Sequence, residues 1–155
     1  MAVSNSSVRK FRVAGAAVLA AGALGAATLT AAPAQAAPIA VQQIPANGVL
    51  SMGLGAWSGY AAAIRVRTAN VVGQAYLSAP GGDACNRGAA GKYVRYDYTN
   101  VSSGRGGSVT VRPCPGPFSG PLEVKISPGP GQIVGTITIV SPGVWAIPGG
   151  ATFAL

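Results

Sequence analysis

Residues 122–140 of the chain read LEVKISPGPGQIVGTITIV. The first five of these residues alternate apolar and charged side chains, which is typical of a β-strand with one face on a core and the other in water. Proline and glycine then interrupt the chain at residues 127–131. Residues 133–140 form an uncharged, β-branched run that suits a strand covered on both faces. Two strands joined by a Pro-Gly turn are therefore the unit from which this fold is predicted.

The same pattern repeats on either side of this stretch. Further strands are predicted at residues 39–44, 64–67, 71–77, 93–98, 108–112, 144–147 and 151–155. Pro-Gly and Gly-Gly pairs mark tight turns between many of them, and no stretch after residue 36 has a helical period free of Gly and Pro. We therefore predict an all-β fold, a small immunoglobulin-like β-sandwich of about seven to nine short antiparallel strands with one disulfide.

The N-terminus has the three parts of a secretory signal peptide. Residues 1–12 carry three basic and no acidic side chains, and residues 13–32 are an uncharged run rich in Ala, Val, Leu and Gly. Ala34 and Ala36 supply the small side chains that signal peptidase requires. A retained membrane anchor is the alternative for an apolar run of this length. The sequence predicts a cleavable signal at residues 1–36, a secreted, extracellular protein, and no integral membrane association after cleavage.

The remaining chain divides in two. Residues 37–48 contain two prolines and an Asn-Gly pair, which favour a flexible lead-in, and residues 49–155 suffice for a single β-sandwich domain. Three of the chain's eleven Lys and Arg lie in the signal, and its three acidic residues all follow it, so the expected mature protein has a net charge of +5. These basic residues are dispersed, which indicates a solvated surface and no nucleic-acid partner.

The two cysteines, Cys85 and Cys114, both follow the signal. In an oxidising compartment an even number of cysteines predicts a disulfide. Closing a loop of about 30 residues contributes on the order of 3.5 kcal/mol in the chain-entropy model. Two thiols without a single histidine make a zinc site improbable. We expect no metal and no cofactor.

The side chains available for catalysis are few. The absence of histidine removes the usual general base. The only carboxylates are Asp83, Asp97 and Glu123, which the strand patterns place on the surface rather than in a paired acid site. A Ser-Lys pair using Lys92 or Lys125 remains open, although neither lysine stands in an apolar context. We predict that the protein is not an enzyme.

Binding is the remaining function. Trp57 stands between two glycines, where its ring could stack on a sugar or pack in the core, and Tyr60 follows three residues later. Tyr93 lies on the polar face of its strand. Arg87, in a loop tethered by Cys85, and Arg112, beside Cys114, could each present a basic side chain to a protease pocket. Asn100-Val101-Ser102 fits an N-glycosylation acceptor, but the Ala-rich signal points to a bacterial source and weakens that interpretation.

Four short stretches are similar to parts of known secreted β-proteins. Residues 146–153, AIPGGATF, resemble the last turn and strand of immunoglobulin-like sandwiches, and residues 57–66, WSGYAAAIRV, resemble an early strand of bacterial cellulose-binding modules. Residues 82–86 and 109–112 are similar to pieces of the enediyne-carrying apoproteins of actinomycetes, which have four cysteines and an acidic surface where this chain has two and a basic one. Each resemblance is confined to the stretch quoted and implies a β-sandwich only.

The function predicted from these features is a secreted, non-catalytic binding protein acting at the cell envelope or in the extracellular medium. Its expected partner is a cell-wall polymer or polysaccharide, ahead of an extracellular protein. The first alternative is a secreted inhibitor of an extracellular hydrolase. The second is a surface-assembling protein that uses residues 133–140, whose composition suits a cross-β segment, although a buried central strand explains the same residues.

Overall fold

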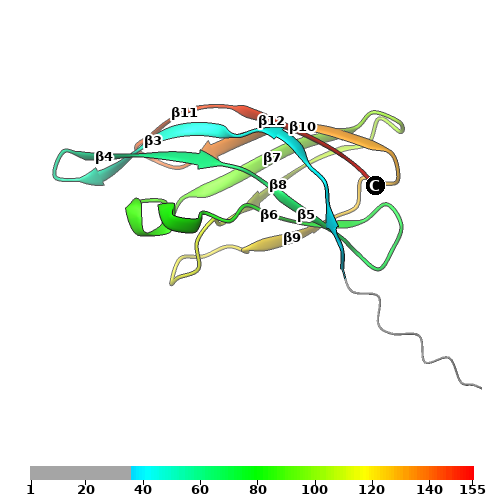
Figure 1. Cartoon of the computed structure of the whole chain (residues 1–155), viewed down its shortest axis with the longest axis horizontal. Coiled ribbons are helices and arrows are strands. Elements are labelled where there is room, and N and C mark those ends of the chain that lie inside the picture. The colour runs from blue at the N-terminus through cyan, green and yellow to red at the C-terminus, as the bar shows by residue number, and fades with distance from the viewer. Residues whose placement is uncertain (1–35) are drawn as a thin grey trace, which may run out of the picture. The chain divides into compact units, whose positions relative to one another are not determined.

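The computed structural model describes residues 36–155, and within them it contains twelve β-strands and one short 3₁₀ helix (Figure 1). The elements are β1 (Pro38–Ile39), β2 (Gln42–Ile44), β3 (Ala46–Gly53), β4 (Ala56–Ala62), β5 (Arg65–Thr68), β6 (Ala75–Ser78), η1 (Gly82–Arg87), β7 (Tyr93–Asn100), β8 (Gly106–Val111), β9 (Glu123–Ile126), β10 (Gln132–Val140), β11 (Val144–Ile147) and β12 (Gly149–Ala154). All strand pairs are antiparallel, and Cys85 is bonded to Cys114. The predicted all-β fold with antiparallel sheets and one disulfide is confirmed. The predicted signal peptide lies outside the described residues, except for Ala36.

The strands form three sheets, with the orders β1-β5-β6-β9, β2-β12-β10-β7-β8 and β11-β3-β4. β10 is the central strand of the second sheet. It pairs with β12 along residues 132–137 and with β7 along residues 133–140. Because both of its edges are hydrogen-bonded, this β-branched strand offers no free backbone over residues 133–137 to another chain.

Gly135 makes room in β10 for a buried tyrosine. A Cβ atom at Gly135 would lie 2.3 Å from the carbonyl oxygen of Asp97 and 2.6 Å from Cζ of Tyr96. The Tyr96 hydroxyl donates a hydrogen bond of 3.1 Å to the carbonyl oxygen of Ala151. Since Ala151 lies on β12, the tyrosine crosses β10 and ties the two flanking strands together, which only a residue without a side chain permits at position 135.

The three-stranded sheet continues the five-stranded one. β2 leads into β3 through Pro45 and β11 leads into β12 through Pro148, and both strand pairs keep the same register. Proline donates no ladder hydrogen bond, so the pairing is interrupted at this point. A Cβ at Gly149 would lie 2.2 Å from the carbonyl oxygen of Ile44 and 2.4 Å from the nitrogen of Ala46. Glycine therefore allows the two backbones to cross closely where the ladder resumes.

A glutamine side chain marks the place where the chain leaves the β4 sheet for the β5 sheet. The backbone nitrogen of Ile64 donates to Oε1 of Gln43 at 2.9 Å, and Nε2 of Gln43 donates to the carbonyl oxygen of Ile64 at 3.0 Å. Ile64 is buried and lies between two strands, so no neighbouring strand pairs with it. The side-chain amide of Gln43 takes that place and satisfies both the N–H and the C=O group of Ile64.

One cluster of buried side chains draws on all three sheets and on η1. Its largest fully buried members include Leu50, Ile64, Leu77, Val94, Tyr96, Val111, Ile133 and Ile137. The predicted alternation is confirmed in β5, where Val66 is buried and Arg65 is exposed.

Two parts of the chain differ from the sequence prediction. β6 begins only at Ala75, because a hydrogen bond of 3.1 Å from Gln74 N to Val71 O closes a turn that leaves Val71 and Val72 exposed. Residues 37–48, predicted to be a flexible lead-in with a single strand at 39–44, contain β1, β2 and the start of β3. The segment predicted as one strand at residues 39–44 forms both β1 and β2, and β3 and β4 were not predicted at all, so the structure has twelve strands instead of seven to nine. The small and uncharged residues of β3 and β4 give too weak a hydrophobic alternation to reveal them.

Two buried tyrosines provide a matched test of the core. The Tyr60 hydroxyl is buried and makes no hydrogen bond to a described residue, whereas that of Tyr96 bonds Ala151. A buried polar group without a partner is destabilising. We expect Tyr60→Phe to raise the free energy of unfolding by up to about 1 kcal/mol and Tyr96→Phe to lower it by about 1 kcal/mol, measured by urea unfolding. Equal losses in both variants would contradict this difference.

The same tyrosines predict alkaline unfolding. Burial raises the pKa of both Tyr60 and Tyr96 from their ordinary value of 10.0 to about 12. The unfolded chain therefore loses these protons first, so the stability is complete below pH 10 and falls as the pH rises to about 12. The midpoint of urea unfolding should decline over this interval, and the decline should be smaller in Tyr60→Phe. A midpoint that stays constant to pH 12 would contradict the assignment.

Candidate functional site

The outer face of the three-stranded sheet differs from the rest of the surface. Along β3, Ala46, Gly48 and Leu50 are buried and the residues between them are exposed. Residues paired across an antiparallel ladder share a face, so the exposed set can be followed across the sheet. We call it the tryptophan face, and it consists of Asn47, Val49 and Ser51 of β3, Trp57, Gly59 and Ala61 of β4, and Trp145 and Ile147 of β11.

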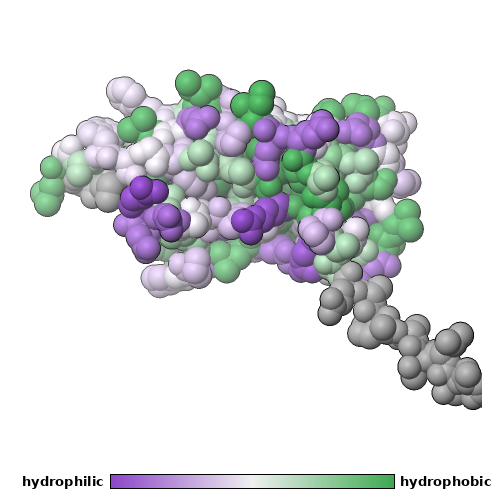
Figure 2. All heavy atoms as spheres, viewed as in Figure 1, coloured by the Kyte–Doolittle hydropathy of each residue, from purple (hydrophilic) through white to green (hydrophobic). Residues whose placement is uncertain are grey.

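The chain's only two tryptophans stand on this face. Trp57 is 59% exposed and Trp145 is 80% exposed, unusual values for the residue type with the most apolar area to bury. Trp145 of β11 pairs with Val49 of β3, and Val49 pairs on its other side with Gly59 of β4. Trp57 is two residues before Gly59 on β4, so the two tryptophans are two strands and two residues apart. Strands about 4.8 Å apart with a rise of about 3.4 Å per residue place the two Cα atoms about 12 Å apart. Figure 2 shows hydrophobic residues standing out along the edge where Figure 1 places β11.

The tryptophan face carries no charge. The chain has no charged side chain at residues 37–64 or 126–155, so every charge of the described domain lies between Arg65 and Lys125. Asn47 and Ser51 are the polar side chains of the face. Beside Trp145, residues 47–49 and 145–147 line a shallow hollow of about 400 Å³. The face is therefore apolar and uncharged, with a few hydrogen-bonding groups.

The structure separates the two aromatic candidates of β4. Trp57 points outward, whereas Tyr60 is on the inner face and only 4% exposed. Tyr60 thus belongs to the core rather than to a binding surface. The alternation of β4 explains the difference, because residues three apart in a strand point to opposite faces.

Tyr93 and Arg112 hold the loop of residues 113–121. Nε of Arg112 donates to the carbonyl oxygen of Gly120 at 2.6 Å, and Nη1 donates to that of Gly116 at 3.2 Å. The Tyr93 hydroxyl donates to the carbonyl oxygen of Ser119 at 3.2 Å. These polar groups are engaged within the chain, so Arg112 does not project as a free side chain toward a partner.

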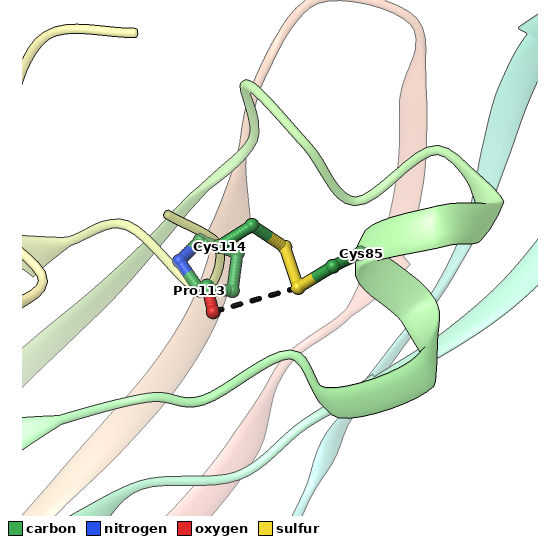
Figure 3. Close-up of a disulfide and its surroundings, with 3 residues drawn as sticks. All are labelled: Cys85, Pro113 and Cys114. Atoms are coloured by element: carbon green, nitrogen blue, oxygen red, sulfur yellow. Dashed lines mark hydrogen bonds between the residues drawn. A yellow bond between two sulfur atoms is a disulfide. The ribbon is translucent and has the colours of Figure 1, made fainter. Parts of the chain in front are cut away.

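Arg87 is an exposed side chain in η1, two residues after Cys85. Figure 3 shows Cys85 reaching from η1 to Cys114, which follows β8. Sγ of Cys85 lies 3.7 Å from the carbonyl oxygen of Pro113, a contact without a hydrogen, since a bonded sulfur has no proton to donate. Of the two arginines proposed to enter a protease pocket, Arg87 and Arg112, only Arg87 is near the disulfide with its side chain exposed to solvent. It lies in a helical turn.

Two of the three carboxylates are tied to arginines. Nε and Nη2 of Arg67 donate to the two carboxylate oxygens of Glu123, and the Arg67 guanidinium lies 4.3 Å from the centre of the Tyr76 ring. Nε and Nη2 of Arg95 donate to Oδ1 of Asp97 at 2.9 and 2.7 Å. These hydrogen bonds lower the pKa of both carboxyl groups. At neutral pH neither is available as a proton donor.

Asn100 is a structural residue. It is fully buried, and its Nδ2 atom donates to the carbonyl oxygens of Pro128, Gly129 and Pro130 at 3.0–3.2 Å. Its Oδ1 atom accepts hydrogen bonds from the nitrogens of Ser102 and Ser103. This amide joins the end of β7 to the turn before β10, and in the folded chain it is not accessible as a glycosylation acceptor.

The described residues contain no cluster of three or more His, Cys, Asp or Glu side chains suited to a metal ion. Their single helix, η1, has six residues, and no helix in this range has the length and apolar composition of a membrane span. Comparison of the chain with protein-family models, with curated proteins and with solved structures finds no match.

Trp145 is the residue of this face that sequence reasoning missed. β11 reads VWAI between Pro142 and Pro148, and all four of its residues are apolar. Without polar residues, the sequence of β11 does not indicate which of its two faces points to solvent. The available signal was the absence of charge on both β4 and β11, together with the chain's second tryptophan.

Proposed function

We propose that the protein is a secreted, non-catalytic binding protein that contacts a neutral polysaccharide of the cell envelope or its surroundings through the tryptophan face. The observation that carries this proposal is the presence of both tryptophans, exposed, on one uncharged sheet face. We further infer that the sheets pack as a small β-sandwich of the immunoglobulin-like kind. The single core cluster supplied by all three sheets supports that arrangement.

Aromatic stacking favours a sugar ligand. One face of a sugar ring consists of C–H groups, which pack on the electron-rich face of an indole. Two indoles about 12 Å apart can contact separate sugar rings of one extended polysaccharide. Gly59 and Ala61 have little or no side chain, so they do not obstruct the polysaccharide beside the two indoles. Asn47 and Ser51 supply polar atoms for sugar hydroxyls.

The charge distribution favours a neutral polymer. The basic residues that would attract an anionic polymer lie between residues 65 and 125, and none of them belongs to β3, β4 or β11. An exposed apolar face that excludes charge would gain nothing from an anionic ligand. Secretion is supported by the N-terminal sequence and is compatible with the disulfide.

The structure gives the alternatives less support. Arg87 projects from a helical turn rather than from the extended backbone that peptides adopt along a sheet edge. The carboxylates of Asp97 and Glu123 are each bound to an arginine, which supports a non-catalytic role. Assembly through residues 133–140 would first require opening hydrogen-bonded pairs on both sides of β10.

Co-sedimentation tests the proposal. The protein recovered from the medium of a secreting host is mixed with purified cell walls or insoluble neutral polysaccharides at low and moderate salt. We expect retention that survives added salt, because no ion pairs are involved. Trp57→Ala and Trp145→Ala should each weaken it roughly tenfold, and the double variant should abolish it.

Phe118→Ala is the matched control, since Phe118 is an exposed aromatic residue on the 113–121 loop, outside the tryptophan face. It should bind like the wild type. Retention that disappears with salt would show that the positive charge is responsible, and retention unchanged in the double tryptophan variant would place binding elsewhere. Either result would contradict the proposal.

A further inference from the structure

β4 is an unprotected sheet edge. Of the other edge strands, β1 and β2 have two and three residues, β9 carries Glu123 and Lys125, and β11 has four residues and stops at Pro148. β8 is longer but lies against β9. β4 has seven residues without a charge or a proline. Short strands, charges and prolines are among the devices that prevent pairing at an edge, and β4 has none of these three.

No described strand covers β4 on the side away from β3. η1 contacts β4, but the backbone hydrogen bonds of residues 81–92 go to residues within that segment and to Pro113. Every second residue of β4 therefore turns its N–H and C=O groups to an unpaired edge. Such an edge is a template for one more strand.

We propose that the strand added at β4 is β4 of a second copy of this chain, paired antiparallel about a two-fold axis that passes between Gly59 and the Gly59 of the second copy. In a symmetric antiparallel pair, two residues that lie opposite each other must both direct their backbone groups toward the partner strand. The axis therefore passes between one residue and its own copy, which lie opposite each other. The axis at Gly59, the central residue of β4, uses all seven residues. It sets Trp57 opposite the small Ala61 of the other copy, and no two large side chains meet on the outer face.

Charge does not oppose self-association at this edge. The expected mature protein has a net charge of +5, so two copies repel one another over most approaches. β4 lies within residues 37–64, which carry no charged side chain, and pairing there brings no like charges into contact. The result is a continuous six-stranded sheet, β11-β3-β4-β4-β3-β11, with four tryptophans on one face. This dimer goes beyond the proposed function and does not depend on the ligand.

The mass in solution tests the dimer. An interface of one strand pair is small, so we expect a dissociation constant in the micromolar range, seen by sedimentation equilibrium over about 1 to 300 μM. A Cβ at Gly59 would meet no atom within 4 Å, so a side chain there is compatible with the fold. Gly59→Lys and Gly59→Glu each place two like charges face to face at the axis and should weaken the dimer at least about tenfold.

An equimolar mixture of Gly59→Lys and Gly59→Glu should recover a dimer, because opposite charges then meet at the axis. Gly59→Ala, without a charge, should remain dimeric, and so should Asn47→Lys, which adds a charge on the same face but on the inner strand β3. A wild type that stays monomeric throughout the concentration range would overturn the proposal. So would a dimer that all four variants leave unchanged.

Discussion

Asn100→Asp is expected to lower the free energy of unfolding by at least about 3 kcal/mol at neutral pH. In the wild type, Nδ2 of Asn100 donates to three carbonyl oxygens, of Pro128, Gly129 and Pro130. The substitution keeps the shape but replaces this donor with an anionic oxygen that faces the same three acceptors. The site is fully buried, so water cannot relieve the repulsion. Urea unfolding measures the loss.

Asn70→Asp is the control for this substitution. Asn70 is exposed and makes no side-chain hydrogen bond to a described residue, so the same chemical change should alter the stability by less than about 0.5 kcal/mol. The deficit of Asn100→Asp should also shrink at acid pH, where the protonated carboxyl group regains one donor. A loss below about 1 kcal/mol at neutral pH would show that Asn100 does not organise the turn before β10.

Removal of the disulfide is the second large effect. Cys85 and Cys114 are 29 residues apart, and the bond closes a loop that contains the end of η1 and the whole of β7 and β8. The cross-link restricts the unfolded chain, so Cys85→Ser/Cys114→Ser should lower the free energy of unfolding by about 3.5 kcal/mol. Gly81 packs against both sulfurs, where a Cβ would lie 2.8 Å from Sγ of Cys85. The double variant should therefore also loosen the start of η1.

Reduction of the wild type supplies the control. A reductant should bring its unfolding midpoint to that of the double serine variant and should leave the variant itself unchanged. A variant that loses less than about 1 kcal/mol would mean that packing alone fixes the 80–92 segment.

The strands that sequence predicted well are those in which charge and apolarity alternate. In 93–98 the polar residues identify the solvent face, so both the strand and its orientation follow. At 122–126 the strand is confirmed from Glu123 to Ile126, but Leu122, expected on the core side, lies before β9 and is exposed. The disulfide was predictable because the chain has only two cysteines, which can form a single pair. β3, β4 and β11 contain almost no polar contrast. β3 and β4 were therefore not predicted as strands, β11 was predicted from its apolar composition, and the orientation of Trp145 could not be predicted.

The candidate site was predictable in part for the same reason. Trp57 was identified from its flanking glycines, but the face it belongs to is assembled from strands almost 90 residues apart in sequence, joined by the pairing of Trp145 with Val49. Tyr93 and Arg112 were assigned to binding because their partners, the carbonyl oxygens of residues 116–120, are backbone atoms that no side-chain pattern reveals.

Tryptophan fluorescence tests the central claim most directly. Since Trp57 and Trp145 are the only tryptophans and both lie on the tryptophan face, the whole emission of the protein reports on this surface. We expect strong quenching by acrylamide in the free protein, and protection together with a blue shift when the protein binds a neutral polysaccharide. A polysaccharide that binds the protein while the quenching stays unchanged would contradict the claim that this face is the binding site.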